Sequence, residues 1–133
     1  MDIQQLTDAE RRVIAARVEQ VQALVAYRQH LAAHIADIEQ VITAIEAGQK
    51  LYRAGNASKG LPACAACHGP VGAGIPAQYP RIGGQFAEYT EAQLKSFRAG
   101  ERANDPNRMM RAVADKMSDT EIKAISDYIA GLR

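Results

Sequence analysis

The sequence of 133 residues has only two cysteines, no tryptophan and two phenylalanines. Two cysteines cannot form the set of disulfides that holds many small secreted domains together. No segment approaches the ~20 consecutive apolar residues of a membrane-spanning helix, so we expect no membrane span in this chain. The net charge of +1, from 16 basic and 15 acidic residues, argues against nucleic acid as a partner. The hydrophobic content of 47% is nevertheless sufficient for a packed core.

Glycine and proline are absent from the first third of the chain. All ten glycines lie at or after Gly48, and all five prolines lie at or after Pro62. The charge changes at the same place, because residues 1–47 carry seven acids and four bases (net −3) and residues 48–133 carry eight acids and twelve bases (net +4). The sequence therefore predicts two domains, residues 1–47 and residues 48–133.

Residues 7–47 have the pattern of one long helix. Thr7 followed by Glu10 is a capping-box sequence, which predicts that the helix begins at Thr7. Apolar residues then recur at spacings near three and four, which is a heptad pattern typical of a coiled coil. Arg17 and Arg28 occupy two positions of this otherwise apolar seam. The seam residues are Ile14, Val21, Leu24, Leu31, Ile35, Ile38, Ile42 and Ile45.

The apolar stripe of this helix is wider than a two-stranded seam requires, which suits a bundle of three or more helices. A single long helix cannot bury its own stripe, so we favour a homo-oligomer formed through residues 7–47. Docking on a different subunit and folding back on its own domain are the alternatives. His30 and His34 lie four residues apart and could share a metal ion, but two ligands do not make a site, and a solvated helix face explains them better. The residues that widen the stripe are Val13, Val18, Val25, Tyr27 and Val41.

Both cysteines belong to the motif Cys64-Ala65-Ala66-Cys67-His68. The C-x-x-C-H spacing allows two thiols to form thioethers with the vinyl groups of one haem, while the next residue presents its imidazole to the iron. A zinc site would need two further ligands, and a thioredoxin-like dithiol would need a βαβ context that the sequence lacks. The motif therefore predicts one covalent haem c held by Cys64 and Cys67, with His68 as an iron ligand.

An electron-transfer haem usually has a second protein ligand on its iron, often a methionine. Of the four methionines, Met1 lies outside the haem domain, and Met117 precedes a helix cap and looks like a core residue. Met109 and Met110 follow Pro106 in a polar stretch, where a loop could bring a sulfur to the iron. Spacing alone does not separate Met109 from Met110.

The remainder of the second domain predicts helices joined by glycine- and proline-rich loops, without an alternating strand pattern. Thr90 with Gln93 predicts a helix start, and that helix is expected to end at Gly100. Ser118 with Glu121 predicts the start of a final helix.

The final helix runs toward Gly131 and is expected to cross the segment that precedes the haem motif. Gly48 would allow the close approach, and Tyr52 and Tyr128 would pack at the contact.

Several motifs in this order resemble class I c-type cytochromes, and in particular one haem domain of the periplasmic cytochrome c4 family. The resemblance covers about residues 46–133 and rests on Gly48–Arg53, Cys64–His68, Tyr79–Gln85 and the stretch from Met110 to Asp119. It implies an all-α fold, that of a class I cytochrome c, preceded here by a long coiled-coil-like helix. It further implies a periplasmic one-electron carrier in which Met110, not Met109, matches the axial iron ligand.

The resemblance also assigns further residues to the haem pocket. It implies that the Pro80 carbonyl accepts the Nδ1 proton of His68, which would fix the orientation of the imidazole. Arg81, Gln85, Tyr89 and Arg102 become candidates for lining the haem or meeting its propionates. The family has two haem domains in one chain, whereas this chain has one C-x-x-C-H motif and the long helix.

We therefore expect an electron carrier that is not an enzyme, acting with redox partner proteins. The alternatives are a haem-bearing subunit of a larger oxidoreductase, and a ligand-binding or peroxidase-like haem protein in which Met110 is displaced. Haem attachment normally follows export, as the resemblance implies, so we expect a periplasmic protein although no signal or anchor is present in this sequence.

Overall fold

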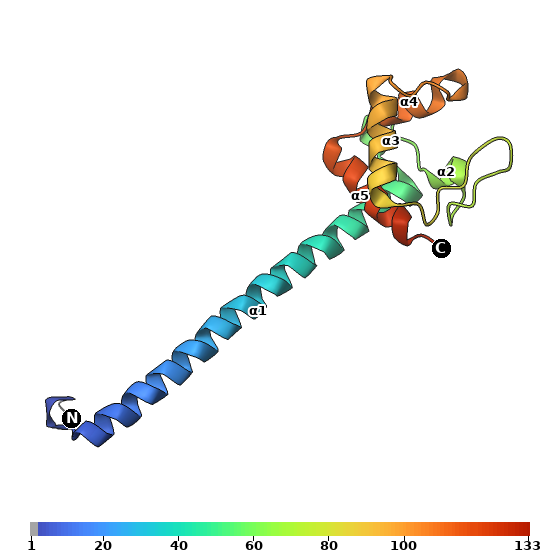
Figure 1. Ribbon diagram of the computed structural model, residues 1–133. Helices are drawn as coiled ribbons and strands as arrows, with labels where there is room; N and C mark the ends of the chain where they lie inside the picture. The colour runs from blue at the N-terminus through green and yellow to red at the C-terminus, as the bar shows by residue number, and fades with distance from the viewer. Residues whose placement is uncertain (1–2) are drawn as a thin grey trace. The chain divides into compact units, whose positions relative to one another are not determined.

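The computed structural model describes residues 3–133 and contains helices but no strand in that range (Figure 1). The α-helices are α1 (Asp8–Ala54), α2 (Ala65–His68), α3 (Ala87–Ala99), α4 (Met109–Ala114) and α5 (Asp119–Gly131). Three short 3-10 helices are η1 (Ile3–Gln5), η2 (Ala57–Lys59) and η3 (Pro106–Arg108). The predicted all-α fold is confirmed. No helix in residues 3–133 has the length and hydropathy needed to cross a membrane.

The chain divides into two compact units, residues 1–40 and residues 41–133. Helix α1 contains the end of the first unit and the beginning of the second, and it continues through Gly48 to Ala54 without a break. The expected boundary between residues 47 and 48 therefore falls inside a helix, and it stays a prediction.

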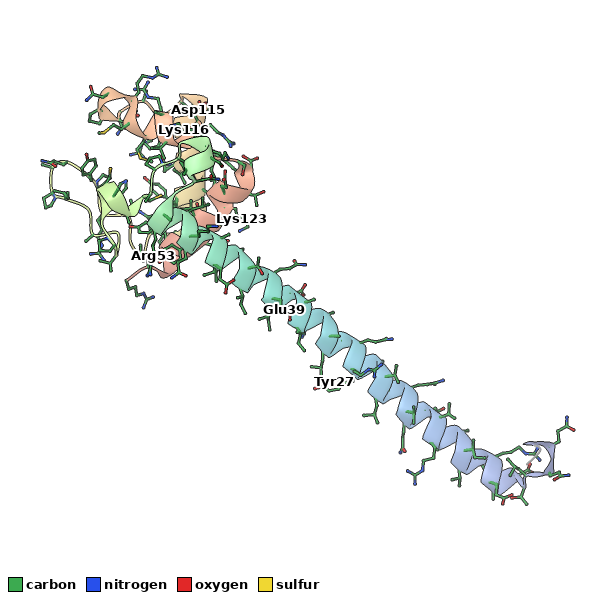
Figure 2. All side chains as sticks on the ribbon, turned by 180° about the vertical axis from the view of Figure 1, so that it is seen from behind. Tyr27, Glu39, Arg53, Asp115, Lys116 and Lys123 are labelled. Atoms are coloured by element: carbon green, nitrogen blue, oxygen red, sulfur yellow. The ribbon has the colours of Figure 1, made fainter. Side chains whose placement is uncertain are left out.

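Helix α1 begins where the capping box predicted. The Thr7 amide donates to Glu10 Oε2 (2.8 Å), and the Glu10 amide donates to Thr7 Oγ1 (3.3 Å). Every residue from Asp8 to Thr43 is exposed. The large apolar side chains of the stripe range from 41% exposed at Leu31 to 68% at Leu24. Figure 2 shows side chains standing out along the helix, with Tyr27 and Glu39 labelled.

The core of the second unit gathers around α5. Helix α3 packs against α4 and α5. Met117 is buried in this core, as the sequence predicted. The core side chains are Tyr52, Leu61, Leu94, Met117, Ile122, Ile125, Ile129 and Leu132.

The end of α1 crosses α5 at Gly48. A Cβ atom at Gly48 would overlap the carbonyl oxygen of Ala124 and lie 2.9 Å from Cβ of Tyr128, so only glycine permits this approach. Tyr52 is fully buried one turn later, with its ring centroid 5.5 Å from that of Tyr128. The predicted crossing, with both tyrosines at the contact, is confirmed.

The predicted start of α3 at Thr90 is wrong, because the helix begins at Ala87. Thr90 lies inside the first turn, where its hydroxyl donates to the Phe86 carbonyl oxygen (3.1 Å). The predicted end is correct, since Gly100 has φ 77° and its amide donates to the Phe97 carbonyl.

The predicted start of α5 is also correct. The Ser118 amide donates to Glu121 Oε2 (2.8 Å), and the Glu121 amide donates to Ser118 Oγ (3.2 Å).

Candidate haem site

The C-x-x-C-H motif forms a single helical turn at the edge of a cavity. Cys64 precedes α2, and the His68 amide donates to the Cys64 carbonyl oxygen (2.9 Å). Cys64, Cys67 and His68 all line a cavity of about 500 Å³. Cavities of this size hold small molecules and cofactors. One helical turn thus brings two thiols and an imidazole to the same cavity.

The His68 imidazole is buried and held by its own hydrogen bond. Its Nδ1 lies 2.9 Å from the Pro80 carbonyl oxygen. A proton on Nδ1 would be donated to that carbonyl, leaving the lone pair of Nε2 available for a metal ion. The resemblance implied this pairing, and the structure brings the two residues together.

The loop after α2 can reach His68 because Gly74 allows the close approach. Gly74 has φ 71°, and its amide donates to the His68 carbonyl oxygen (2.8 Å). A Cβ at Gly74 would lie 2.7 Å from the Pro80 carbonyl oxygen. A larger residue here would therefore displace the Pro80 carbonyl that faces the imidazole.

Two methionines line the same cavity, and they differ in burial. Met109 is 37% exposed, whereas Met110 is half-buried and packs against the core. Both begin α4, immediately after η3. Their thioethers are soft ligands of the kind that bind haem iron.

The segment before Met110 has an unusual backbone that is tied down by one carboxylate. Asn107 (φ 53°) and Arg108 (φ 59°) are consecutive left-handed residues that are not glycine. The Asp105 carboxylate, whose side chain is 3% exposed, accepts hydrogen bonds from the Arg111 amide (2.9 Å) and from Arg111 Nε (2.8 Å). This carboxylate therefore closes the segment and fixes the start of the helix that carries Met110.

The remaining predicted pocket residues all lie on this cavity: Pro80, Arg81, Gln85, Tyr89 and Arg102. Arg102 is held in place, because its Nη1 donates to Gln93 Oε1 (2.8 Å) and its guanidinium carbon lies 4.5 Å from the centroid of the Phe97 ring. Arg81 and Tyr89 are exposed. The structure thus brings every predicted site residue to one cavity.

The apolar residues of the cavity wall were not singled out from the sequence. They come mainly from α3, α4 and α5, and their spacing marks them equally well as core residues. A signal was present, since the buried face of each amphipathic helix must cover either another helix or a ligand. These residues are Ile82, Leu94, Phe97, Val113, Ile125 and Ile129.

The two motif thiols differ in exposure, because Cys64 is partly buried and Cys67 is exposed. Burial raises the pKa of the Cys64 thiol to about 11.

These residues fit a covalently attached haem. The cavity has a largely apolar wall, both motif thiols at its edge, an imidazole with Nδ1 occupied, and a thioether from a separate helix. Haem proteins adjust their cofactor through such axial ligands, hydrogen bonds and burial. The fold and the site together define a c-type cytochrome.

Comparison with known proteins agrees with this class. The model of the cytochrome c family matches residues 45–133, and the chain belongs to this family. Residues 1–44 lie outside the match.

The matched region is similar to cytochrome c4 proteins. Cytochrome c4 of Azotobacter vinelandii is 52% identical over 90 residues, which are 66% of this chain and 43% of that protein. The thiosulfate dehydrogenase electron acceptor of Stutzerimonas stutzeri (strain A1501) is 44% identical over 85 residues, or 64% of this chain and 39% of that protein.

A solved structure gives the same result. The crystal structure of reduced recombinant cytochrome c4 from Pseudomonas stutzeri superposes with a TM-score of 0.66 at 46% identity, over 68% of this chain and 49% of that chain. The predicted resemblance and the class I cytochrome c fold are confirmed. The chain spans less than half the length of these relatives.

Proposed function

We propose that this chain is an electron-transfer cytochrome that carries one covalent haem c. The observation that supports this most directly is the C-x-x-C-H turn at the edge of the cavity, with His68 held against the Pro80 carbonyl oxygen. The haem would supply one-electron redox chemistry at its iron. Cys64 and Cys67 would hold the haem, and His68 would present Nε2 to the iron.

Met110 is the proposed second axial ligand. Its packing against the core favours it over the more exposed Met109, because a ligand needs a fixed position. A thioether ligand raises the reduction potential relative to a second histidine. If His68 and Met110 both bound the iron, no ligand position would be left for a substrate, so the proposal is a carrier and not an enzyme.

The pocket residues divide into two groups by chemistry. All seven residues line the cavity. Leu94, Phe97 and Ile125 would exclude water from the cofactor, and Arg81, Gln85, Tyr89 and Arg102 would offer hydrogen-bond donors to its propionates.

Haem attachment is tested on protein produced in a host that can attach haem c. We expect the haem to remain bound after denaturation in acid and acetone, and to show a reversible change of absorption between the reduced and oxidised states. Cys64→Ala with Cys67→Ala should release the haem to the solvent. Extractable haem in the unsubstituted protein would contradict the proposal.

The identity of the axial methionine is tested with Met110→Ala, using Met109→Ala as the matched control. Carbon monoxide should bind the ferrous Met110→Ala protein and leave both the unsubstituted protein and the Met109→Ala protein unchanged. Carbon monoxide binding to the unsubstituted protein would instead favour a ligand-binding or peroxidase-like haem.

We further propose that the protein acts in the periplasm and meets acidic redox partners. The net charge of +4 on residues 48–133, reduced by the two haem propionates, would attract such a partner. Electron-transfer rates should fall as the salt concentration rises, since salt screens this attraction. A rate independent of salt would contradict a charge-guided partner.

The exposed apolar stripe of α1 supports a homo-oligomer formed through residues 7–47. The alternative is a haem subunit of a larger oxidoreductase, and the name of one relative, thiosulfate dehydrogenase electron acceptor, is compatible with it. Sedimentation of the purified protein distinguishes them, because the first predicts a multiple of the chain mass and the second predicts a second polypeptide that copurifies.

A further inference from the structure

The charges along α1 are distributed unevenly between its two halves. All four bases of residues 8–47 lie between Arg11 and Arg28, and residues 29–47 contain Asp37, Glu39 and Glu46 without a lysine or arginine. Two of the bases, Arg17 and Arg28, occupy the apolar seam itself. The orientation of any partner helix is therefore constrained by charge as well as by the apolar stripe.

A parallel pair of α1 helices would bring like charges together. In register, Arg17 would face Arg17 of the second copy, and Arg28 would face Arg28. Facing like charges inside a seam are unfavourable, because neither can be solvated fully and each repels the other.

We propose that copies of this chain pair antiparallel along α1, with residue i of one copy level with residue 59 − i of the other, and that this pair is the repeating unit of the wider bundle that the stripe suits. This inference rests on the self-association proposed above and specifies its geometry. At this register Ile14 faces Ile45, Val21 faces Ile38, and Leu24 faces Ile35 of the second copy.

The same register places the seam arginines beside complementary groups. Arg17 faces Ile42 of the second copy, and Glu39 and Glu46 lie one turn to either side of Ile42 on the flank that Arg17 reaches. The aliphatic stem of Arg17 would cover the seam while its guanidinium contacts the carboxylates of Glu39 and Glu46.

Two further pairs follow on the flanks of the seam. Arg11 comes beside Glu46, and Arg28 comes one turn from the ring of Tyr27 of the second copy, where a cation–π contact can form.

The register is specific to within one heptad. Moving the second copy by seven residues in either direction removes one of the two glutamates from Arg17. The same shift leaves either Ile14 or Ile45 without an accessible apolar residue opposite it. Only the register in which the numbers of facing residues add up to 59 pairs the whole stripe from Ile14 to Ile45.

The overlap is long enough for a stable interface. Thirteen large apolar side chains between Val13 and Ile45 are exposed on each copy. An overlap from residue 14 to residue 45 is about 47 Å long at 1.5 Å per residue. Burying the stripe of both copies would remove on the order of 1,500 Å² from water, which is the size of a standard specific interface.

The orientation is tested by cross-linking haem-loaded protein with a short bis-maleimide. Two variants are prepared, Leu24→Cys and Ile35→Cys, and are tested separately and after mixing to allow exchange of chains. We expect covalent dimer in the mixed sample and none in either variant alone. Treatment of the unsubstituted protein controls for reaction of Cys64 and Cys67.

A matched pair on the outer face is the second control. Ala26→Cys and Ala33→Cys also sum to 59 but lie on the opposite side of the helix from the seam, so their mixture should give no covalent dimer.

A charge exchange gives an independent readout. Arg17→Glu should weaken association about tenfold or more, because it replaces two attractions with two repulsions. Adding Glu39→Arg to the same chain should restore part of the association, as measured by sedimentation at several concentrations. Glu46 is left unchanged in this variant because Arg11 of the second copy lies beside it.

The outcomes separate this inference from the proposed function. Cross-linking of Leu24→Cys with itself would show a parallel pair and overturn the antiparallel inference, with self-association intact. A monomer at all concentrations would overturn both the self-association and the inference, whereas the haem spectrum would still report on electron transfer alone.

Discussion

At the scale of single residues, the position of Met110 depends on the Asp105 carboxylate. Left-handed backbone at a residue other than glycine costs roughly 1–2 kcal/mol, and Asn107 and Arg108 adopt it in succession. The two hydrogen bonds that Asp105 accepts from Arg111 offset this cost and close the segment. The carboxylate would thus act on the proposed iron ligand, Met110, by fixing the start of its helix.

Replacing Asp105 with alanine should therefore release Met110 from its fixed position. We expect Asp105→Ala to bind carbon monoxide in the ferrous state and to lose about 3 kcal/mol of unfolding free energy, as expected when one partner of a buried ion pair is removed. Absorption spectroscopy and urea titration measure the two effects. Asp115→Ala, an exposed carboxylate just after the same helix, should change neither, and an unaltered spectrum in Asp105→Ala would contradict the role.

The close approach of α1 and α5 at Gly48 leads to a second prediction at this scale. Gly48→Ala would force its methyl group into the Ala124 carbonyl oxygen, so the end of α1 and α5 must move apart. We expect a loss of about 1–3 kcal/mol, which is typical of overpacking. Gly131→Ala is the control, because a Cβ there meets nothing within 4 Å. Equal thermal midpoints for the two variants would show that the crossing tolerates separation.

At the scale of secondary-structure elements, capping sequences predicted two of three helix starts. Thr7 with Glu10 and Ser118 with Glu121 both form reciprocal hydrogen bonds. Thr90 with Gln93 does not, because a threonine within a first turn can donate to the carbonyl four residues earlier. The formed and the unformed capping boxes share one sequence pattern, a serine or threonine followed three residues later by glutamate or glutamine. Only the backbone conformation of the preceding residues decides whether the helix begins there.

In the candidate haem site, the polar residues could be predicted from the sequence, whereas the apolar residues could not. The motif, the resemblance and the methionine pair predicted which polar and sulfur-bearing side chains meet at one cavity. The apolar wall of the cavity could not be predicted, because Leu94, Phe97 and Ile125 would have the same helical spacing in a core without a cavity. Spacing alone did not separate Met110 from Met109. The resemblance favoured Met110, and its packing against the core, which only the folded molecule shows, supports that choice.

The start of α5 makes a prediction about pH. The Lys59 ammonium hydrogen bond and the Ser118 amide hydrogen bond lower the pKa of Glu121 from 4.5 to about 2. Because the folded pKa lies below the unfolded one, the stabilisation is complete above about pH 4.5 and is lost as the pH falls toward about 2.

Glu121→Gln should consequently be less stable than the unsubstituted protein by about 1–3 kcal/mol at pH 7, with a difference that shrinks below pH 4.5. Urea unfolding at several pH values measures this difference. Glu88→Gln serves as the control because its carboxylate lies in the first turn of α3 and is exposed. A difference that stays constant down to pH 2 would show that Glu121 stabilises α5 by packing alone.

At the scale of the whole molecule, one chain combines a family domain with a helix that begins outside the family match and ends inside it. The match begins at residue 45, and the residues that line the cavity all lie at or after Pro62. The exposed stripe ends at Ile45. The proposed assembly and the proposed haem site therefore involve separate sets of residues, although α1 is continuous through the boundary.

This separation predicts that assembly can be abolished without a change at the haem. A charged residue in the middle of the stripe cannot be buried without a partner, so Leu24→Glu combined with Ile38→Glu should reduce the sedimenting species to a monomer. The absorption spectrum and the reduction potential should stay unchanged, because neither residue lines the cavity. Ala26→Glu, on the outer face of α1, should leave the assembly intact. A shifted potential in the monomeric variant would instead show that assembly and the haem site are coupled.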